Sequence, residues 1–166
     1  HTGLNYNFKR LSKAIERSHK SINTCVERHK SSEVLNNASL IGSIVGTGHK
    51  DLCGEFIEKL LNYKENLCGV TLQGLTDGSD HSFIVKVEYL DVIFSYNGRL
   101  IPKNLLRILE GCWNPIVILL AIDNGWDLFD GSYPVKLSDA GYALRLKFDI
   151  DTNDDTPYFL DLNDSK

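Results

Sequence analysis

The sequence contains no methionine and only four cysteines in 166 residues, at Cys25, Cys53, Cys68 and Cys112. So few cysteines argue against a disulfide scaffold, and because none forms a CxxC pair, a zinc-binding motif is absent too. We therefore expect reduced thiols in a reducing compartment, with no metal and no cofactor. A chain without methionine that starts at His1 is expected to be a fragment of a longer protein.

Long apolar runs and an excess of positive charge are also missing. The longest apolar run, Pro115–Ile122, falls well short of the roughly 20 residues that a bilayer-spanning helix needs. The net charge is −4, with 18 basic and 22 acidic residues. This balance gives no general attraction to nucleic acid or to an anionic membrane. We expect neither a membrane span nor a nucleic-acid partner.

What remains is the composition of an ordinary globular protein, with 42% hydrophobic and 24% charged residues. A chain of this length is large enough to bury a core of its own. We expect a single domain over residues 1–166, with a helical part over about 7–64 and a sheet part over about 67–162.

Helical periodicity dominates the first part of the chain. Apolar residues such as Phe8, Leu11 and Ile15 recur at helical spacing between Asn7 and Lys30, which predicts one long amphipathic helix. Its other face is basic, through Lys9, Arg10, Lys13, Arg17, Lys20 and Arg28. That face is either a surface for phosphates or an acidic partner, or an ordinary solvated helix face. A second helix is predicted from Cys53 to Tyr63.

Further along, the pattern becomes that of strands. We predict strands over Cys68–Leu75, Ser82–Tyr89 and Val92–Tyr96, the last two forming a hairpin. Pro102 to Leu109 predicts an inserted helix, because proline often opens a helix and Gly111 can end one.

The remaining segments also have the composition of strands. Pro115–Ile122 is predicted to be a buried strand, with Trp126–Phe129 pairing back across the turn between them. Short strands are predicted at Pro134–Leu137, Tyr142–Ile150 and Tyr158–Leu162. Helices followed by such strands predict an α+β fold in which N-terminal helices pack on a mostly antiparallel sheet.

A cysteine and a histidine stand out as candidate catalytic residues. Cys53 lies at the predicted start of a helix, where the helix dipole favours a thiolate. His81 opens a predicted strand and is a candidate base for that thiol. In the predicted hairpin, Asn97 returns beside His81 and is a candidate to orient its ring, whereas Asp91 lies at the other end. A buried structural cysteine and a turn histidine are the alternative.

These segments resemble the papain-like fold, and more narrowly the papain-like effector and toxin domains of bacteria. The resemblance covers about residues 46–98 and implies that Cys53 is the nucleophile, His81 the base and Asn97 the orienting residue. Papain-like proteases usually carry a glutamine about six residues before the cysteine, and this chain has Thr47 there. That departure favours a glutamine deamidase over a thiol protease.

A second resemblance is to the CheD-like and cytotoxic-necrotising-factor-like deamidases. Several of those carry a threonine six residues before the cysteine, as Thr47 stands before Cys53. In that case Thr47 is the third site residue and Asn97 is not involved.

Both resemblances imply a cysteine hydrolase with a catalytic triad that acts on a protein amide. The expected protein is a secreted or translocated bacterial effector or toxin, a virulence factor that acts in the cytosol of a target cell. Its expected partner is a protein substrate from a host or competitor cell. The alternative from another class is a non-catalytic interaction or immunity module that uses a sheet edge and the region of Trp113 or Trp126.

Overall fold

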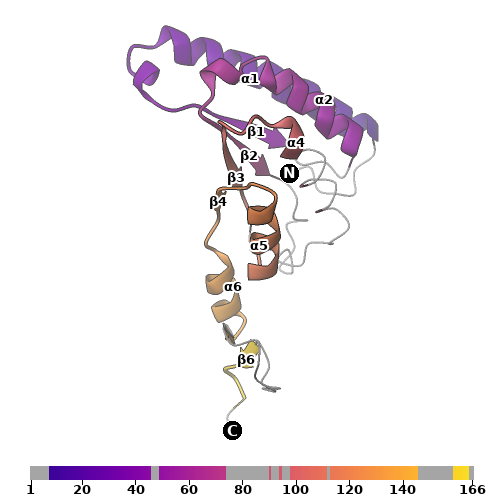
Figure 1. Ribbon diagram of the computed structural model, residues 1–166, viewed down its shortest axis with the longest axis vertical. Coiled ribbons are helices and arrows are strands. Elements are labelled where there is room, and N and C mark those ends of the chain that lie inside the picture. The colour runs from indigo at the N-terminus through magenta and orange to yellow at the C-terminus, as the bar shows by residue number, and fades with distance from the viewer. Residues whose placement is uncertain are drawn as a thin grey trace. The chain divides into compact units, whose positions relative to one another are not determined.

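The computed structural model describes residues 8–45, 49–73, 90, 94, 98–111, 113–145 and 159–164 (Figure 1). The chain divides into two compact units, His1–Asp130 and Gly131–Lys166. Whether both belong to one domain, as the sequence suggests, stays a prediction. In the described part of the chain, no helix is both long enough and apolar enough to cross a membrane.

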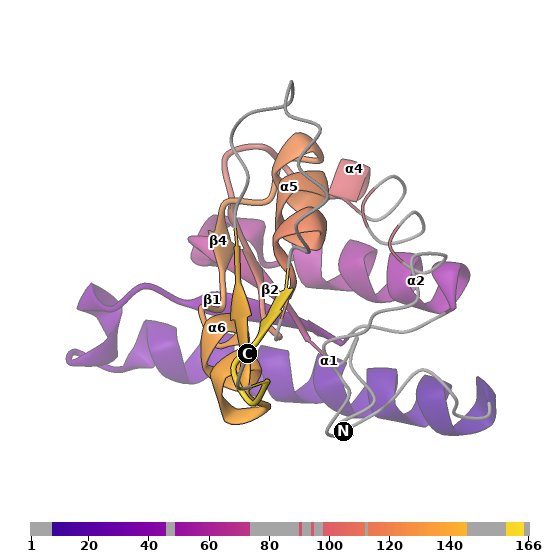
Figure 2. The same cartoon turned by 90° about the horizontal axis from the view of Figure 1, so that it is seen from below.

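Two long helices open the first unit. Helix α1 spans Phe8–Ser31, as its periodicity predicts, and buries Leu11, Ala14, Ile15 and Val26 along one stripe. A short 3-10 turn, η1, follows at Leu35–Asn37. Helix α2 spans Lys50–Leu61 and so begins three residues before the predicted start at Cys53. The two helices run side by side and both contact β1, defined below (Figures 1 and 2).

The sheet of this unit is parallel, which contradicts the predicted mostly antiparallel α+β fold. Its strands are β1 (Ile41–Val45), β2 (Gly69–Gln73), β3 (Leu106–Leu109) and β4 (Leu128–Phe129). They stand in sequence order, and each neighbouring pair is parallel. Parallel neighbours require a crossover connection, and helix α2 lies between β1 and β2 in the chain. The fold is therefore α/β.

Helix α5, Pro115–Asp123, occupies the run that was predicted to be a buried strand. The Asn114 side chain caps it by accepting a hydrogen bond from the Val117 N–H at 2.9 Å, and Pro115 stands in its first turn. Both features favour a helix start. The predicted pairing of Trp126–Phe129 with this run is therefore wrong, since β4 pairs with β3 instead.

Strand β3 replaces the helix that was predicted over Pro102–Leu109. Alternate residues of this strand, Arg107 and Leu109, are buried, as period-two packing requires. Its backbone pairs with β2 on one side and β4 on the other. A short helix, α4, lies just before this segment at Gly98–Leu100. The predicted hairpin strands Ser82–Tyr89 and Val92–Tyr96 lie outside the described residues, except for Phe94.

The second unit contains one helix and one strand pair. Helix α6 spans Tyr133–Asp139, where a strand over Pro134–Leu137 was predicted. Proline in the first turn of a helix costs little, so Pro134 is compatible with this start. Strands β5 (Tyr142–Leu144) and β6 (Phe159–Asp161) pair antiparallel, within the two segments predicted to contain strands.

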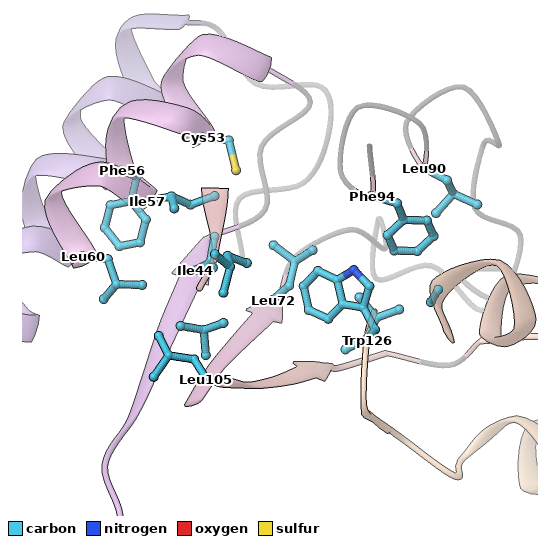
Figure 3. Packing of buried hydrophobic residues seen from close by; sticks show 14 of the residues in the cluster. Ile44, Cys53, Phe56, Ile57, Leu60, Leu72, Leu90, Phe94, Leu105 and Trp126 are labelled. Carbon is cyan, nitrogen blue, oxygen red and sulfur yellow. The ribbon is translucent and has the colours of Figure 1, made fainter. Parts of the chain in front are cut away.

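The core of the first unit lies between the sheet and its helices (Figure 3). Fully buried aliphatic and aromatic side chains from α2 meet those of the strands, including Phe56, Leu60, Ile44 and Leu72. At Gly69 the backbones of β2 and β3 approach so closely that an added Cβ would lie 2.6 Å from the Leu106 carbonyl oxygen. Glycine is therefore required at this point of the sheet.

Candidate functional site

The carboxyl ends of the four parallel strands mark the place where a ligand site is expected. In open sheets and barrels of parallel strands, ligands bind at the edge where the strands end and the following helices begin. In the first unit, β1 to β4 end at Val45, Gln73, Leu109 and Phe129. The described residues that follow these ends make up the carboxyl edge discussed below.

A carboxylate is held in place at this edge. Glu110 directly follows β3 and is exposed, and its Oε1 accepts a hydrogen bond of 2.7 Å from the Thr71 hydroxyl. Thr71 lies on β2 and is 6% exposed. The Glu110 N–H also donates to the Leu72 carbonyl oxygen at 3.2 Å, which extends the strand pairing beyond β3. The carboxylate therefore sits on a rigid support.

A second carboxylate follows the neighbouring strand. Leu109 of β3 pairs in register with Phe129 of β4, so Glu110 and Asp130 are the next residue on each strand. Both are exposed. Since neighbouring parallel strands lie about 5 Å apart, this register brings two acidic residues to adjacent strand ends. Such a pair can accept hydrogen bonds from a ligand and can exchange protons with it.

The chain turns sharply just beyond Glu110. Gly111 has a φ of +134°, which disfavours residues with a side chain, and a Cβ added there would lie 3.1 Å from the indole of Trp113. Trp113 is fully buried, and its Nε1–H has no hydrogen-bond partner among the described residues. A bulky buried ring thus supports the turn that follows the carboxylate.

The start of α2 lies at the same edge, because α2 follows β1. His49 directly precedes this helix, and its ring meets Phe8 edge to face with the ring centroids 5.7 Å apart. Phe8 is the first residue of α1. The amino-terminal ends of both helices therefore lie together near the carboxyl edge.

The predicted nucleophile lies in the core. Cys53 is the fourth residue of α2, is 0% exposed, and extends from the helix into the buried cluster (Figure 3). Its backbone N–H donates to the His49 carbonyl oxygen at 3.0 Å, within the first turn of the helix. His81 and Asn97 lie outside the described residues, so the Cys53–His81–Asn97 site stays a prediction. Thr47 and Asp91, the alternative third residues, also lie outside them.

A cavity of about 600 Å³ lies at the opposite, amino-terminal edge of the strands. Arg107 lines it and is only 7% exposed. Its guanidinium donates to the carbonyl oxygens of Ile101 at 2.8 Å and Asn124 at 3.4 Å, and its backbone N–H donates to the Asp127 carboxylate at 2.9 Å. These bonds tie the segments before β3 and β4 together, so we assign Arg107 a structural role.

Within the described ranges, no group of three or more histidine, cysteine, aspartate or glutamate side chains is arranged to hold a metal ion. The described groups at the carboxyl edge include two carboxylates, Glu110 and Asp130. Sequence reasoning missed Glu110 and Asp130. The available signal was their position directly after short apolar segments, which is informative only once those segments are recognised as strands.

Comparison with known proteins identifies the family. The sequence model of the family described as Queuine tRNA-ribosyltransferase matches residues 2–161 of the chain. The chain is 30% identical over 149 residues to queuine tRNA-ribosyltransferase accessory subunit 2 of Aedes aegypti, covering 90% of this chain and 35% of that protein. It is 32% identical over 142 residues to the Culex quinquefasciatus protein of the same name, covering 85% and 33%.

The human protein of that name is 28% identical over 146 residues, covering 87% of this chain and 33% of the human protein. The chain thus spans about one third of the length of the relatives that it matches. The parallel α/β sheet described above is consistent with this family.

These matches contradict several expectations from the sequence. The papain-like and CheD-like resemblances are wrong, and with them the deamidase, the thiol protease, the toxin and the virulence factor. The relatives are animal proteins, which contradicts a secreted or translocated bacterial effector. Their names refer to tRNA, which contradicts the expectation of a protein substrate and no nucleic acid.

The Cys-His pattern suggested the wrong family, because the spacing of two residues occurs in many unrelated sequences. The match over residues 2–161, by contrast, draws on nearly the whole sequence. This chain belongs to the queuine tRNA-ribosyltransferase family, a family of transferases.

Proposed function

We propose that this chain is part of an accessory subunit that assembles with a catalytic subunit and supports the transfer of queuine into tRNA. One observation carries the proposal. The curated relatives that cover 85% to 90% of the chain are named accessory subunit 2 of a queuine tRNA-ribosyltransferase.

The charge of the chain supports an accessory role. A protein that holds RNA by itself usually shows a basic surface and a high isoelectric point. This chain has a net charge of −4 and an isoelectric point near 5.7. It is thus better suited to share the RNA with a partner than to hold it alone.

A test of this proposal is to co-express the full chain with the catalytic subunit of a queuine tRNA-ribosyltransferase. We expect co-elution on size exclusion, and incorporation of labelled queuine into tRNA that rises when the chain is added to the catalytic subunit. Absence of both co-elution and stimulation would overturn the proposal.

A second candidate function is favoured by the register of Glu110 and Asp130. Two carboxylates at neighbouring positions are a recurrent arrangement in enzymes that break bonds at a sugar carbon, where one acts as nucleophile and the other as acid or base. The chain itself would then carry out ribosyl transfer. In that case the chain alone would incorporate queuine, and Asp130→Asn and Glu110→Gln would each abolish the reaction. If both variants stimulate the catalytic subunit as the unchanged chain does, the accessory role stands.

A further inference from the structure

The amino-terminal half of α1 concentrates positive charge on one exposed face. Five cations and one acid, Glu16, lie between Phe8 and Lys20, although the chain as a whole is net negative. All five cations are exposed, namely Lys9, Arg10, Lys13, Arg17 and Lys20. Because helical neighbours are three or four residues apart, Lys13, Arg17 and Lys20 form a continuous line, here called the basic stripe.

The side chains of the basic stripe are not held in ion pairs with other described residues, although Glu16 is a helical neighbour of Lys13 and Lys20. Within the part of the chain that the structure describes, Lys13, Arg17 and Lys20 form no ion pair, whereas Lys59 on α2 pairs with Glu55. The stripe therefore presents its charge to solvent.

Two further cations, in the first turn of α1, stand at positions that are unfavourable for the helix itself. The amino-terminal end of a helix carries partial positive charge, so acidic residues stabilise the first turn and basic residues destabilise it. The first turn of α1 contains no acidic residue and includes Lys9 and Arg10. Helix stability therefore does not account for these two cations, and the dipole effect does not extend to the stripe, which begins at Lys13.

The stripe also leads away from the candidate site. Phe8, at the start of α1, contacts the ring of His49 at the carboxyl edge. From there α1 runs alongside α2 (Figures 1 and 2). At 1.5 Å per residue, the stripe from Lys13 to Lys20 extends over about 10 Å, which is enough to contact neighbouring phosphates of a nucleic-acid strand.

We infer that the basic stripe of α1 binds the phosphate backbone of RNA and so directs a tRNA toward the carboxyl edge of the sheet. This inference rests on the proposed function, which supplies the RNA. Lysine and arginine at such positions contact phosphates without reading bases, so the stripe contributes affinity and orientation but no sequence preference.

The test is a charge-reversal variant with a matched control. The stripe variant is Lys13→Glu, Arg17→Glu and Lys20→Glu. The control is Lys30→Glu, Lys64→Glu and Lys103→Glu, which changes the net charge equally at exposed positions off the basic face of α1. Both are assembled with the catalytic subunit, and the dissociation constant for tRNA is measured between 50 and 200 mM salt.

We expect the stripe variant to bind tRNA at least about 10-fold more weakly at low salt and to show a shallower salt dependence, because fewer counterions are released. The control should stay within about 2-fold of the unchanged complex. Circular dichroism should show no loss of helix, since glutamate is tolerated on an exposed helix face.

Three results would overturn the inference: unchanged affinity in the stripe variant, equal loss in both variants, or loss of subunit assembly with tRNA affinity retained. The last would identify the stripe as a surface for an acidic protein partner. Measuring tRNA binding by the chain alone, without the catalytic subunit, separates the accessory role from RNA binding by the basic stripe. Suppose that the unchanged chain binds tRNA but does not assemble with the catalytic subunit, and that the stripe variant loses this binding. That result would refute the accessory role and would support RNA binding by the basic stripe.

Discussion

The hydroxyl of Thr71 on β2 donates a hydrogen bond of 2.7 Å to the carboxylate of Glu110, the residue that follows β3. This bond joins two neighbouring parallel strands where they end. It fixes the direction of an exposed carboxylate through a buried hydroxyl, so the carboxyl edge is ordered by side chains as well as by backbone pairing.

Replacing Thr71 by valine removes the hydroxyl with little change in shape. We expect the free energy of unfolding to fall by about 1 kcal/mol, because the exposed carboxylate of Glu110 regains water in place of the lost bond. Urea denaturation measures the change. Thr71→Ser keeps the donor and should lose less; equal losses in the two variants would show that the hydrogen bond does not contribute.

Gly69→Ala should destabilise the sheet by about 1–3 kcal/mol, since the new Cβ would lie 2.6 Å from a backbone oxygen that cannot move without separating β2 from β3. Thermal and urea unfolding report the loss. Gly131→Ala is the matched control, because no atom lies within 4 Å of an added Cβ there. A Gly69→Ala protein as stable as this control would contradict the described strand spacing.

Cys53 should be alkylated slowly. The sequence predicts that a catalytic Cys53 reacts first with iodoacetamide, whereas its burial at 0% exposure predicts the reverse order. Cys25 and Cys68 are exposed and should react at least ~10-fold faster, because a buried thiol reacts only when the structure opens. Peptide mass mapping over time measures the order, and in urea the three rates should converge. Preferential modification of Cys53 in the folded chain would contradict this expectation and support the prediction that Cys53 is a nucleophile.

Arg107→Met should lower the free energy of unfolding by about 2–3 kcal/mol. The substitution leaves the carbonyl oxygens of Ile101 and Asn124 without the guanidinium that they accept from. Arg99→Met is the control, because Arg99 lines the same cavity but is exposed, and its replacement should cost less than about 0.5 kcal/mol. Similar losses in both variants would argue against a structural role specific to Arg107.

The sequence predicted long, strongly periodic elements well. Helix α1 was predicted nearly to its ends, and the segment of β2 was recognised as a strand, because in both the apolar pattern repeats over the whole element. The segments of β3 and α5 were interchanged. Leu105, Leu106 and Leu109 are spaced as on a helix face, yet the segment lies between two other strands and pairs with both.

The run of α5 has no polar residue from Pro115 to Ile122, so its periodicity could not separate a helix from a buried strand. Asn114 and Pro115 did carry the local signal for a helix start, and the structure shows that cap. Because β3 was predicted to be a helix, the carboxyl edge of the sheet could not be located from the sequence. Glu110 and Asp130 were therefore not recognised as candidate site residues. The family itself could not be reached from a pair of residues such as Cys53 and His81.

The agreement between strand order and chain order has a consequence for how the molecule forms. Among the described strands of the first unit, β2, β3 and β4 each pair with the strand that precedes them in the sequence. Contacts between sequence neighbours lower the loop-closure entropy that folding must overcome. For β2, β3 and β4, one pairing edge is therefore always supplied by a segment that precedes them in the chain, and β1, which α1 and α2 contact, supplies the first such edge.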